Sequence, residues 1–285
     1  MRLAALSAAQ RQALVHALGR PKLEVLPLGG MDQELAALAP GATLAVTASP
    51  AKGLETSVAV GERLQLAGFA VVVHLAARMV RDRGHLHQLL DRLRDGGIER
   101  AFVIGGDARE PGAYPDALSL LRDMADAGHH LREIGIGAYP QGHPVIPDAV
   151  LQAALAAKVP YADYMTTQLC FDADALAGWV AAQRRAGNVL PVDIGIPGAV
   201  EATRLLRISA RIGVADAARF VSKQGSLVAR LLRPGGYRPE GLLRDLAPTL
   251  ADPGAAVRGL HVFTFNQVRA TDAWRRRFLA SLGDG

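Results

Sequence analysis

The sequence predicts an α/β fold, a (β/α)8 TIM barrel with an N-terminal helix. Short apolar runs rich in β-branched residues alternate with amphipathic helical patterns along the whole chain. Strands that alternate with helices lie parallel in one sheet, with the helices as crossovers. Eight such units in 285 residues match a closed barrel better than an open sheet. The predicted strands cover residues 23–28, 43–47, 70–75, 101–104, 134–138, 164–169, 192–196 and 260–265.

Helical patterns fill the spaces between these runs, and most of them end at a glycine. They cover residues 54–68, 85–97, 114–128, 172–187 and 199–213. The long interval 214–258 predicts an extra helix at 217–232 and the last crossover helix before strand eight. Residues 1–20 form an N-terminal helical extension, because Gln10, Arg11 and Gln12 interrupt the apolar run well before the ~18 residues of a membrane span. We expect residues 1–285 to form a single domain.

Composition excludes several classes of function. Half of the residues are apolar and the net charge is only +5. The basic residues are therefore expected on solvated helix faces, with binding of an anionic small-molecule substrate as the alternative, and neither nucleic acid nor a membrane is an expected partner. Cys170 is the only cysteine, which excludes an internal disulfide and indicates a reducing, cytoplasmic compartment. The histidines and aspartates do not reproduce a known metal-ligand spacing, so no metal is expected. A homo-oligomer is compatible with the sequence.

Polar residues follow the predicted strands at the end where a barrel carries its active site. They are Thr47, His74, Asp107, Tyr139, His143, Gln168 and Asn266. Each has a structural alternative. His74 could be a hydrogen-bonded core histidine and Asp107 a helix cap. Gln168 could bond a neighbouring strand, although a ligand is favoured because a buried amide needs several partners.

Glu24 is a charged residue among the apolar residues of the first predicted strand, in "KLEVLPLGG". A buried glutamate loses hydration worth several kcal/mol, unless a partner compensates or the protein uses its acidity. The sequence therefore predicts a functional carboxyl group inside the barrel.

An ordered series of motifs, one for each strand, resembles the methylenetetrahydrofolate reductase family. The motifs are "LEVLPL", "VTASP", "VVVHLAARM", "IGGD", "GAYPQGHP", "YMTTQLCFD", "GIPG" and "HVFTFNQ". The resemblance implies a barrel that reduces 5,10-methylenetetrahydrofolate to 5-methyltetrahydrofolate with NADH or NADPH, usually through bound FAD. The chain ends soon after strand eight, so we expect no regulatory domain and no control by S-adenosylmethionine.

The resemblance also implies roles for single residues. Glu24 matches the general acid, which opens the imidazolidine ring by protonating N10 and would be kept protonated by an apolar interior. Asp107 matches an aspartate that stabilises the cationic iminium, and Gln168 matches a glutamine that contacts the folate and the nucleotide. Asn266 and Gln267 fall at the substrate-binding end of strand eight, where Gln267 replaces an arginine. The predicted FAD-binding positions are Thr47, His74, Asp107, Tyr114, Tyr139, His143 and Lys158.

One departure from the family concerns the flavin. The helix "VLQAALAAK" keeps only Lys158 of the charged and polar groups that hold FAD in other members. Hydrogen bonds to charged groups contribute about 1 to 3 kcal/mol each, so the loss of three predicts much weaker FAD binding. The sequence is also similar to a divergent branch of the family in which NADH reduces the folate directly. Two other functions stay open: tetrahydrofolate-dependent methyl transfer or demethylation, and a non-catalytic folate- or flavin-binding subunit.

Overall fold

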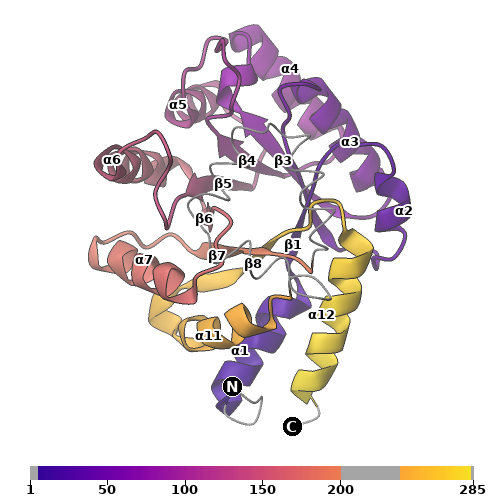
Figure 1. Ribbon diagram of the computed structural model, residues 1–285. Helices are drawn as coiled ribbons and strands as arrows, with labels where there is room; N and C mark the ends of the chain where they lie inside the picture. Colours follow the sequence, from indigo (N-terminus) through magenta and orange to yellow (C-terminus); the bar gives the residue numbers. More distant parts are fainter. Residues whose placement is uncertain (1–5, 200–237, 284–285) are drawn as a thin grey trace.

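A closed barrel of eight parallel strands forms the centre of the protein, as predicted (Figure 1). The structure is a computed structural model that describes residues 6–199 and 238–283. Neighbouring strands follow chain order, and β1 closes the ring by pairing with β8. The strands are β1 (Lys22–Val25), β2 (Thr43–Val46), β3 (Ala70–Ala76), β4 (Arg100–Ile104), β5 (Glu133–Ala138), β6 (Tyr164–Thr167), β7 (Val192–Pro197) and β8 (Val257–Phe263).

Helices surround the barrel (Figure 1). They are α1 (Ala8–Gly19), α2 (Met31–Leu35), α3 (Leu54–Leu66), α4 (Arg83–Asp95), α5 (Ala117–Ala127), α6 (Asp148–Lys158), α7 (Ala173–Arg185), α11 (Glu240–Ala251) and α12 (Val268–Gly283). The predicted N-terminal helix is confirmed as α1, which contacts α11, α12 and β8. The last predicted crossover helix is α11. The helical patterns at 200–213 and 217–232 lie outside the described residues. No helix in the two described stretches is long and apolar enough to cross a membrane.

Local sequence determines where several helices begin. Ser7 caps α1, and its hydroxyl accepts a hydrogen bond from the Gln10 amide while the Gln10 side chain bonds back to the Ser7 amide. Asp116 and Ser119 form the same reciprocal arrangement at the start of α5. Such capping boxes satisfy amide groups that have no partner within the first helical turn.

Four strands end earlier than predicted: β2 ends at Val46 and not at residue 47, β6 ends at Thr167 and not at residue 169, and β1 and β8 end early for local reasons. β1 stops at Val25 and not at residue 28, because Pro27 lacks an amide hydrogen and Leu26 bonds to the side chain of Asn266. β8 stops at Phe263 and not at residue 265, since Phe265 and Asn266 adopt positive φ angles of 50° and 56°. Such left-handed backbone cannot continue a strand.

The strands alternate between a buried outer face and the barrel interior. In β1, Leu23 and Val25 belong to the main apolar core beneath the helices. Ala45, Val72, Phe102 and Tyr164 form a separate apolar cluster. This cluster fills the inside of the barrel. Lys22 and Glu24 share the inner face of β1, and this alternation carries the carboxyl group into the interior.

Candidate active site

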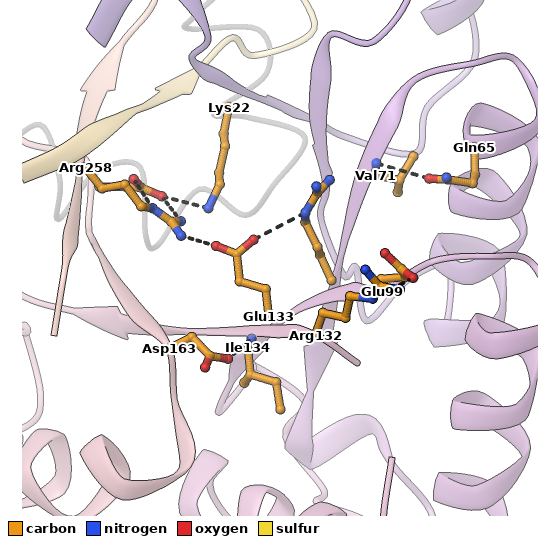
Figure 2. A network of polar contacts seen from close by, with 11 residues as sticks. Lys22, Gln65, Val71, Glu99, Arg132, Glu133, Ile134, Asp163 and Arg258 are labelled. Carbon is orange, nitrogen blue, oxygen red and sulfur yellow. Dashed lines mark hydrogen bonds and ion pairs between the residues drawn. The ribbon is translucent and has the colours of Figure 1, made fainter. Parts of the chain in front are cut away.

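A charged cluster closes the end of the barrel where the strands begin. Lys22 Nζ lies 2.7 Å from Asp193 Oδ2, and Arg258 Nη2 lies 2.8 Å from the same oxygen. Arg258 also pairs with Glu133 (Figure 2). A bulge makes this possible, because Val192 pairs with Val257 but Asp193 pairs with Gly259, so Arg258 is the extra residue. We name Lys22, Glu133, Asp193 and Arg258 the basal charge cluster.

Burial and pairing shift the pKa values within the basal charge cluster. Burial lowers the pKa of Lys22 to about 8, although the charge of Asp193 opposes this change. Burial alone would raise the pKa of Asp193, but hydrogen bonds and charge from Arg258, with the charge of Lys22, hold it below its usual value. The cluster is therefore a set of mutually dependent charges at this end of the barrel.

Glu24 lies above this cluster and has a polar partner. Its Oε2 atom is 3.1 Å from Nε2 of His261 on β8, and their side chains are 18% and 3% exposed. The expected apolar surroundings are thus only partly correct, because His261 provides a hydrogen-bonding group directly at the carboxyl. The His261 ring also makes an edge contact with Phe263, at 4.9 Å between centroids.

The segment after β8 also holds the backbone around Glu24. The Thr264 hydroxyl donates a hydrogen bond of 2.5 Å to the Glu24 carbonyl oxygen. The Asn266 side chain accepts from the Leu26 amide at 2.8 Å and donates to the Leu26 carbonyl at 2.9 Å. Asn266 therefore braces the end of β1, and a substrate contact stays a prediction for it. Gln267 is buried, with 2% exposure, at the start of α12.

Three polar atoms, at inner strand positions or directly after a strand, have no hydrogen-bond partner among the described residues. They are Thr47 Oγ1, His74 Nε2 and Thr166 Oγ1. Burial lowers the pKa of His74 to about 4, so its ring is neutral at pH 7. A buried polar atom without a partner costs about 1–3 kcal/mol, which makes these atoms candidates for ligand contacts. His74 is therefore not a fully hydrogen-bonded core histidine, which was its structural alternative.

Asp107, Tyr139, His143 and Lys158 form an outer group around the ends of β4 and β5. The Tyr139 and His143 rings meet edge to face at 5.4 Å. Burial, and then the negative charge of Asp107, raise the pKa of Tyr139. Tyr139 and Lys158 line a cavity of about 30 Å³ between β5 and α6. Asp107 does not cap a helix, since Asp116 caps α5, so the capping alternative is wrong.

Gln168 follows β6, and Tyr114 lies before α5. Gln168 is exposed just after β6, where its backbone amide donates a hydrogen bond to the Ala138 carbonyl oxygen at 2.7 Å. Its side-chain oxygen accepts from the Leu169 amide at 2.8 Å. Tyr114 is 6% exposed, and its hydroxyl donates to Asp123 on α5.

The residues predicted to bind FAD do not fit its phosphates and ribityl chain. The Tyr114 hydroxyl is engaged by Asp123, and Lys158 Nζ faces the Gly137 carbonyl oxygen at 3.4 Å. Burial lowers the pKa of Lys158. Between the first turn of α6 and Lys158 the exposed residues are Gln152, Ala153, Ala154 and Ala156. The Gln152 side-chain oxygen already accepts a hydrogen bond from Gln183 at 2.8 Å, and the alanines offer none. Diphosphate recognition normally uses charged donors.

No role was predicted for His261, although it begins the motif "HVFTFNQ", and the basal charge cluster was not predicted. The signal for His261 is a histidine at an inner position of an apolar strand, in "GLHVF". For the cluster the signal is a set of charged residues at strand beginnings, which ordinarily suggests solvent exposure. In the parts of the chain that the structure describes, no group of three or more His, Cys, Asp or Glu side chains could hold a metal ion.

Comparison with known structures finds proteins that differ widely from this chain in sequence. A protein from Burkholderia cenocepacia J2315 assigned as a phosphonomutase is 14% identical, with 98% of this chain and 99% of that chain covered and a TM-score of 0.49. A mandelate racemase/muconate lactonizing enzyme from Bordetella bronchiseptica RB50 is 17% identical, with 96% of this chain and 63% of that chain covered and a TM-score of 0.45.

Comparison with protein families is more specific. The family model described as methylenetetrahydrofolate reductase matches residues 38–219. This match covers more than half of the chain and includes β2 to β7, with Thr47, His74, Asp107 and Gln168. The chain belongs to the methylenetetrahydrofolate reductase family.

Proposed function

We propose that the protein reduces 5,10-methylenetetrahydrofolate to 5-methyltetrahydrofolate with NADH or NADPH, and that Glu24 is the general acid. Family membership supports the broader class, folate-dependent reduction or methyl transfer. The observation that carries the specific reaction is the Glu24 carboxyl group, which lies inside the barrel and is held by His261 at 3.1 Å. A ring-opening reduction needs a proton donor at such a place.

The reaction needs one proton and one hydride. Glu24 gives its proton to N10 of the folate, the bond between N10 and the bridging carbon breaks, and a cationic iminium forms at N5. The nicotinamide then transfers hydride to the bridging carbon, which yields the methyl group and NAD(P)+. Glu24 is left as a carboxylate and recovers a proton from solvent.

The other predicted residues act around this centre. Asp107 would stabilise the iminium cation electrostatically, and Gln168 would contact the folate and the nucleotide. The unpartnered atoms of Thr47, His74 and Thr166 would meet polar atoms of whichever ligand fills the barrel mouth. We also propose that residues 1–285 act as one domain, since α1 packs on the barrel through α11, α12 and β8.

The cofactor choice follows from the residues around α6. Members of the family generally use flavin and nicotinamide. The engaged Tyr114 and the exposed alanines of α6 support direct hydride transfer from the nicotinamide to the folate. FAD is therefore not assigned a step.

The decisive experiment is an anaerobic assay of NADH and NADPH oxidation with methylenetetrahydrofolate, on protein stripped of flavin and then with FAD added back. We expect turnover without FAD. Glu24→Gln should lower kcat by at least about 100-fold, the usual contribution of a general acid. Glu99→Gln is a matched control, because Glu99 pairs with Arg132 on the surface at 2.9 Å and should leave turnover unchanged.

Other outcomes would change the assignment. Turnover only with FAD would mean that the flavin binds through contacts other than those of Tyr114 and Lys158. Near-normal turnover of Glu24→Gln would remove the acid role from Glu24. Inactivity under both conditions would favour tetrahydrofolate-dependent methyl transfer or demethylation, or a non-catalytic binding subunit.

A further inference from the structure

The contact between Glu24 and His261 joins the two strands that close the barrel. In the β1–β8 ladder, Lys22 pairs with His261 and Glu24 pairs with Phe263. The His261 side chain thus starts one inner layer below Glu24 and reaches its carboxyl at 3.1 Å. The basal charge cluster lies at the same end of the barrel as His261, and the Glu24 carboxyl group is the polar contact of its Nε2 atom.

The two oxygens of the carboxyl group are not equivalent. Oε2 faces Nε2 of His261, whereas no described residue is placed against Oε1 by a comparable contact. If Nε2 carries the hydrogen, it donates to Oε2 and leaves the transferable proton on Oε1. A hydrogen bond to a carboxylate is about twice as strong as one to a neutral carboxyl group. This contact would therefore strengthen as Glu24 loses its proton, which is the condition for lowering a barrier.

We propose that His261 is a positioning residue that donates its Nε2 hydrogen to Oε2 of Glu24, directs the Oε1 proton toward the substrate and stabilises the carboxylate left after transfer. This inference rests on the proposed function for its catalytic consequence. In the step, the Oε1–H bond breaks, the N10–H bond forms, and His261 keeps its own proton. His261 does not exchange a proton with the folate.

Other charged and titratable groups surround the pair and could contribute to pH dependence. They are His74 from β3 and, one layer below, Lys22, Glu133, Tyr164, Asp193 and Arg258. His74 lies 6.3 Å from His261 between ring centroids. Any pH effect must therefore be measured as a difference between variants that leave these groups unchanged.

Two substitutions of His261 differ in where they place a hydrogen-bond donor. His261→Gln can place its Nε2 hydrogen near the position of the imidazole Nε2, whereas the shorter His261→Asn reaches only the position of Nδ1. We expect kcat of His261→Gln within about threefold of the wild type, and kcat of His261→Asn lowered about 10- to 100-fold, a range typical of a lost catalytic contact. The KM for the folate should stay unchanged in both.

The pH dependence of kcat is a further test, because loss of a merely structural contact would not shift it. The proposed acid is active only while it holds its proton, so one limb of the kcat–pH profile reports its loss. Removal of a hydrogen bond that is stronger to the carboxylate than to the carboxyl group should move this limb to higher pH in His261→Asn but not in His261→Gln. Equal losses in both variants, or an unchanged limb in His261→Asn, would overturn the proposal.

A third measurement does not depend on turnover. Long-range ¹H–¹⁵N NMR spectra of histidine-labelled wild-type protein, with the His261 signal assigned by its loss in His261→Gln, report which ring nitrogen carries hydrogen. We expect the Nε2–H tautomer, and the Nδ1–H tautomer would refute the proposal. If the Nε2–H tautomer is found in a protein that does not reduce methylenetetrahydrofolate, the pairing stands and only the proposed function fails.

Discussion

The ammonium group of Lys22 lies 3.5 Å from the centre of the Tyr164 ring, inside the barrel. The guanidinium of Arg258 lies 3.9 Å from the same centre. A ring placed near two cations gains cation–π attraction, and burial is the main cause of the raised pKa of Tyr164. The acidic groups Asp193 and Glu133 compensate the two cations, so each member of this arrangement depends on the others.

Removal of Asp193 should therefore destabilise the protein strongly. Asp193→Asn leaves Lys22 without its carboxylate partner in a buried site, and breaking a buried pair costs about 3–5 kcal/mol. Urea denaturation followed by circular dichroism measures the change. Asp91→Asn is the control, because the Asp91–Arg94 pair is 56% exposed on both sides and should contribute at most about 1 kcal/mol. Equal effects of the two substitutions would show that the basal charge cluster adds no stability.

Gly135 makes room for Tyr164 and should not tolerate a side chain. A Cβ atom at Gly135 would lie 2.2 Å from Cζ of Tyr164, which is already placed between Lys22 and Arg258. We expect Gly135→Ala to lower the free energy of unfolding by about 1–3 kcal/mol, as overpacking does. Gly178→Ala on α7 has open space around its Cβ and should raise stability by about 0.5–1 kcal/mol. Thermal unfolding of both variants tests this contrast, and a stable Gly135→Ala protein would contradict it.

His74 should make the protein less stable in acid. Its pKa is about 4 in the folded protein and 6.5 as the reference value, so only the unfolded chain binds a proton between these limits. Stability is therefore lost as the pH falls from 6.5 to 4, by up to about 3 kcal/mol. Denaturation curves at pH 7 and pH 4 should show a larger loss for the wild type than for His74→Phe. Parallel losses would mean that His74 does not titrate as described.

Asn266 should matter for both backbone conformation and catalysis. Asn266→Gly removes the two bonds to Leu26 but accepts the positive φ angle, and we expect a loss of about 1–3 kcal/mol. Asn266→Ala should lose about 1 kcal/mol more, because a left-handed backbone is strained in alanine. Since Leu26 ends the strand that carries Glu24, kcat should fall in both variants. Unfolding curves and steady-state kinetics would contradict this interpretation if Asn266→Ala matched the wild type.

Local patterns in the sequence determined the repeated units of the fold. The alternation of apolar runs and amphipathic helices predicted the parallel barrel, and the period of two in "KLEV" placed Glu24 on the inner face of its strand. Capping residues such as Asp116 act within a few residues of the helix they begin, so their effect is readable from the chain. The family motifs were also recognisable, since each one follows a single strand.

Only the tertiary structure decided which residues meet across the closed barrel. His261 and Glu24 are 237 residues apart, and Asn266 and Leu26 are 240 apart. The register between β1 and β8 and the bulge beside Asp193 determine these contacts and the place of Arg258. Neither leaves a local sequence signal, because both arise when the first and last strands meet. In the sequence, the charged residues at the strand beginnings resemble surface residues. In the structure, closure of the barrel places them beside partners of opposite charge.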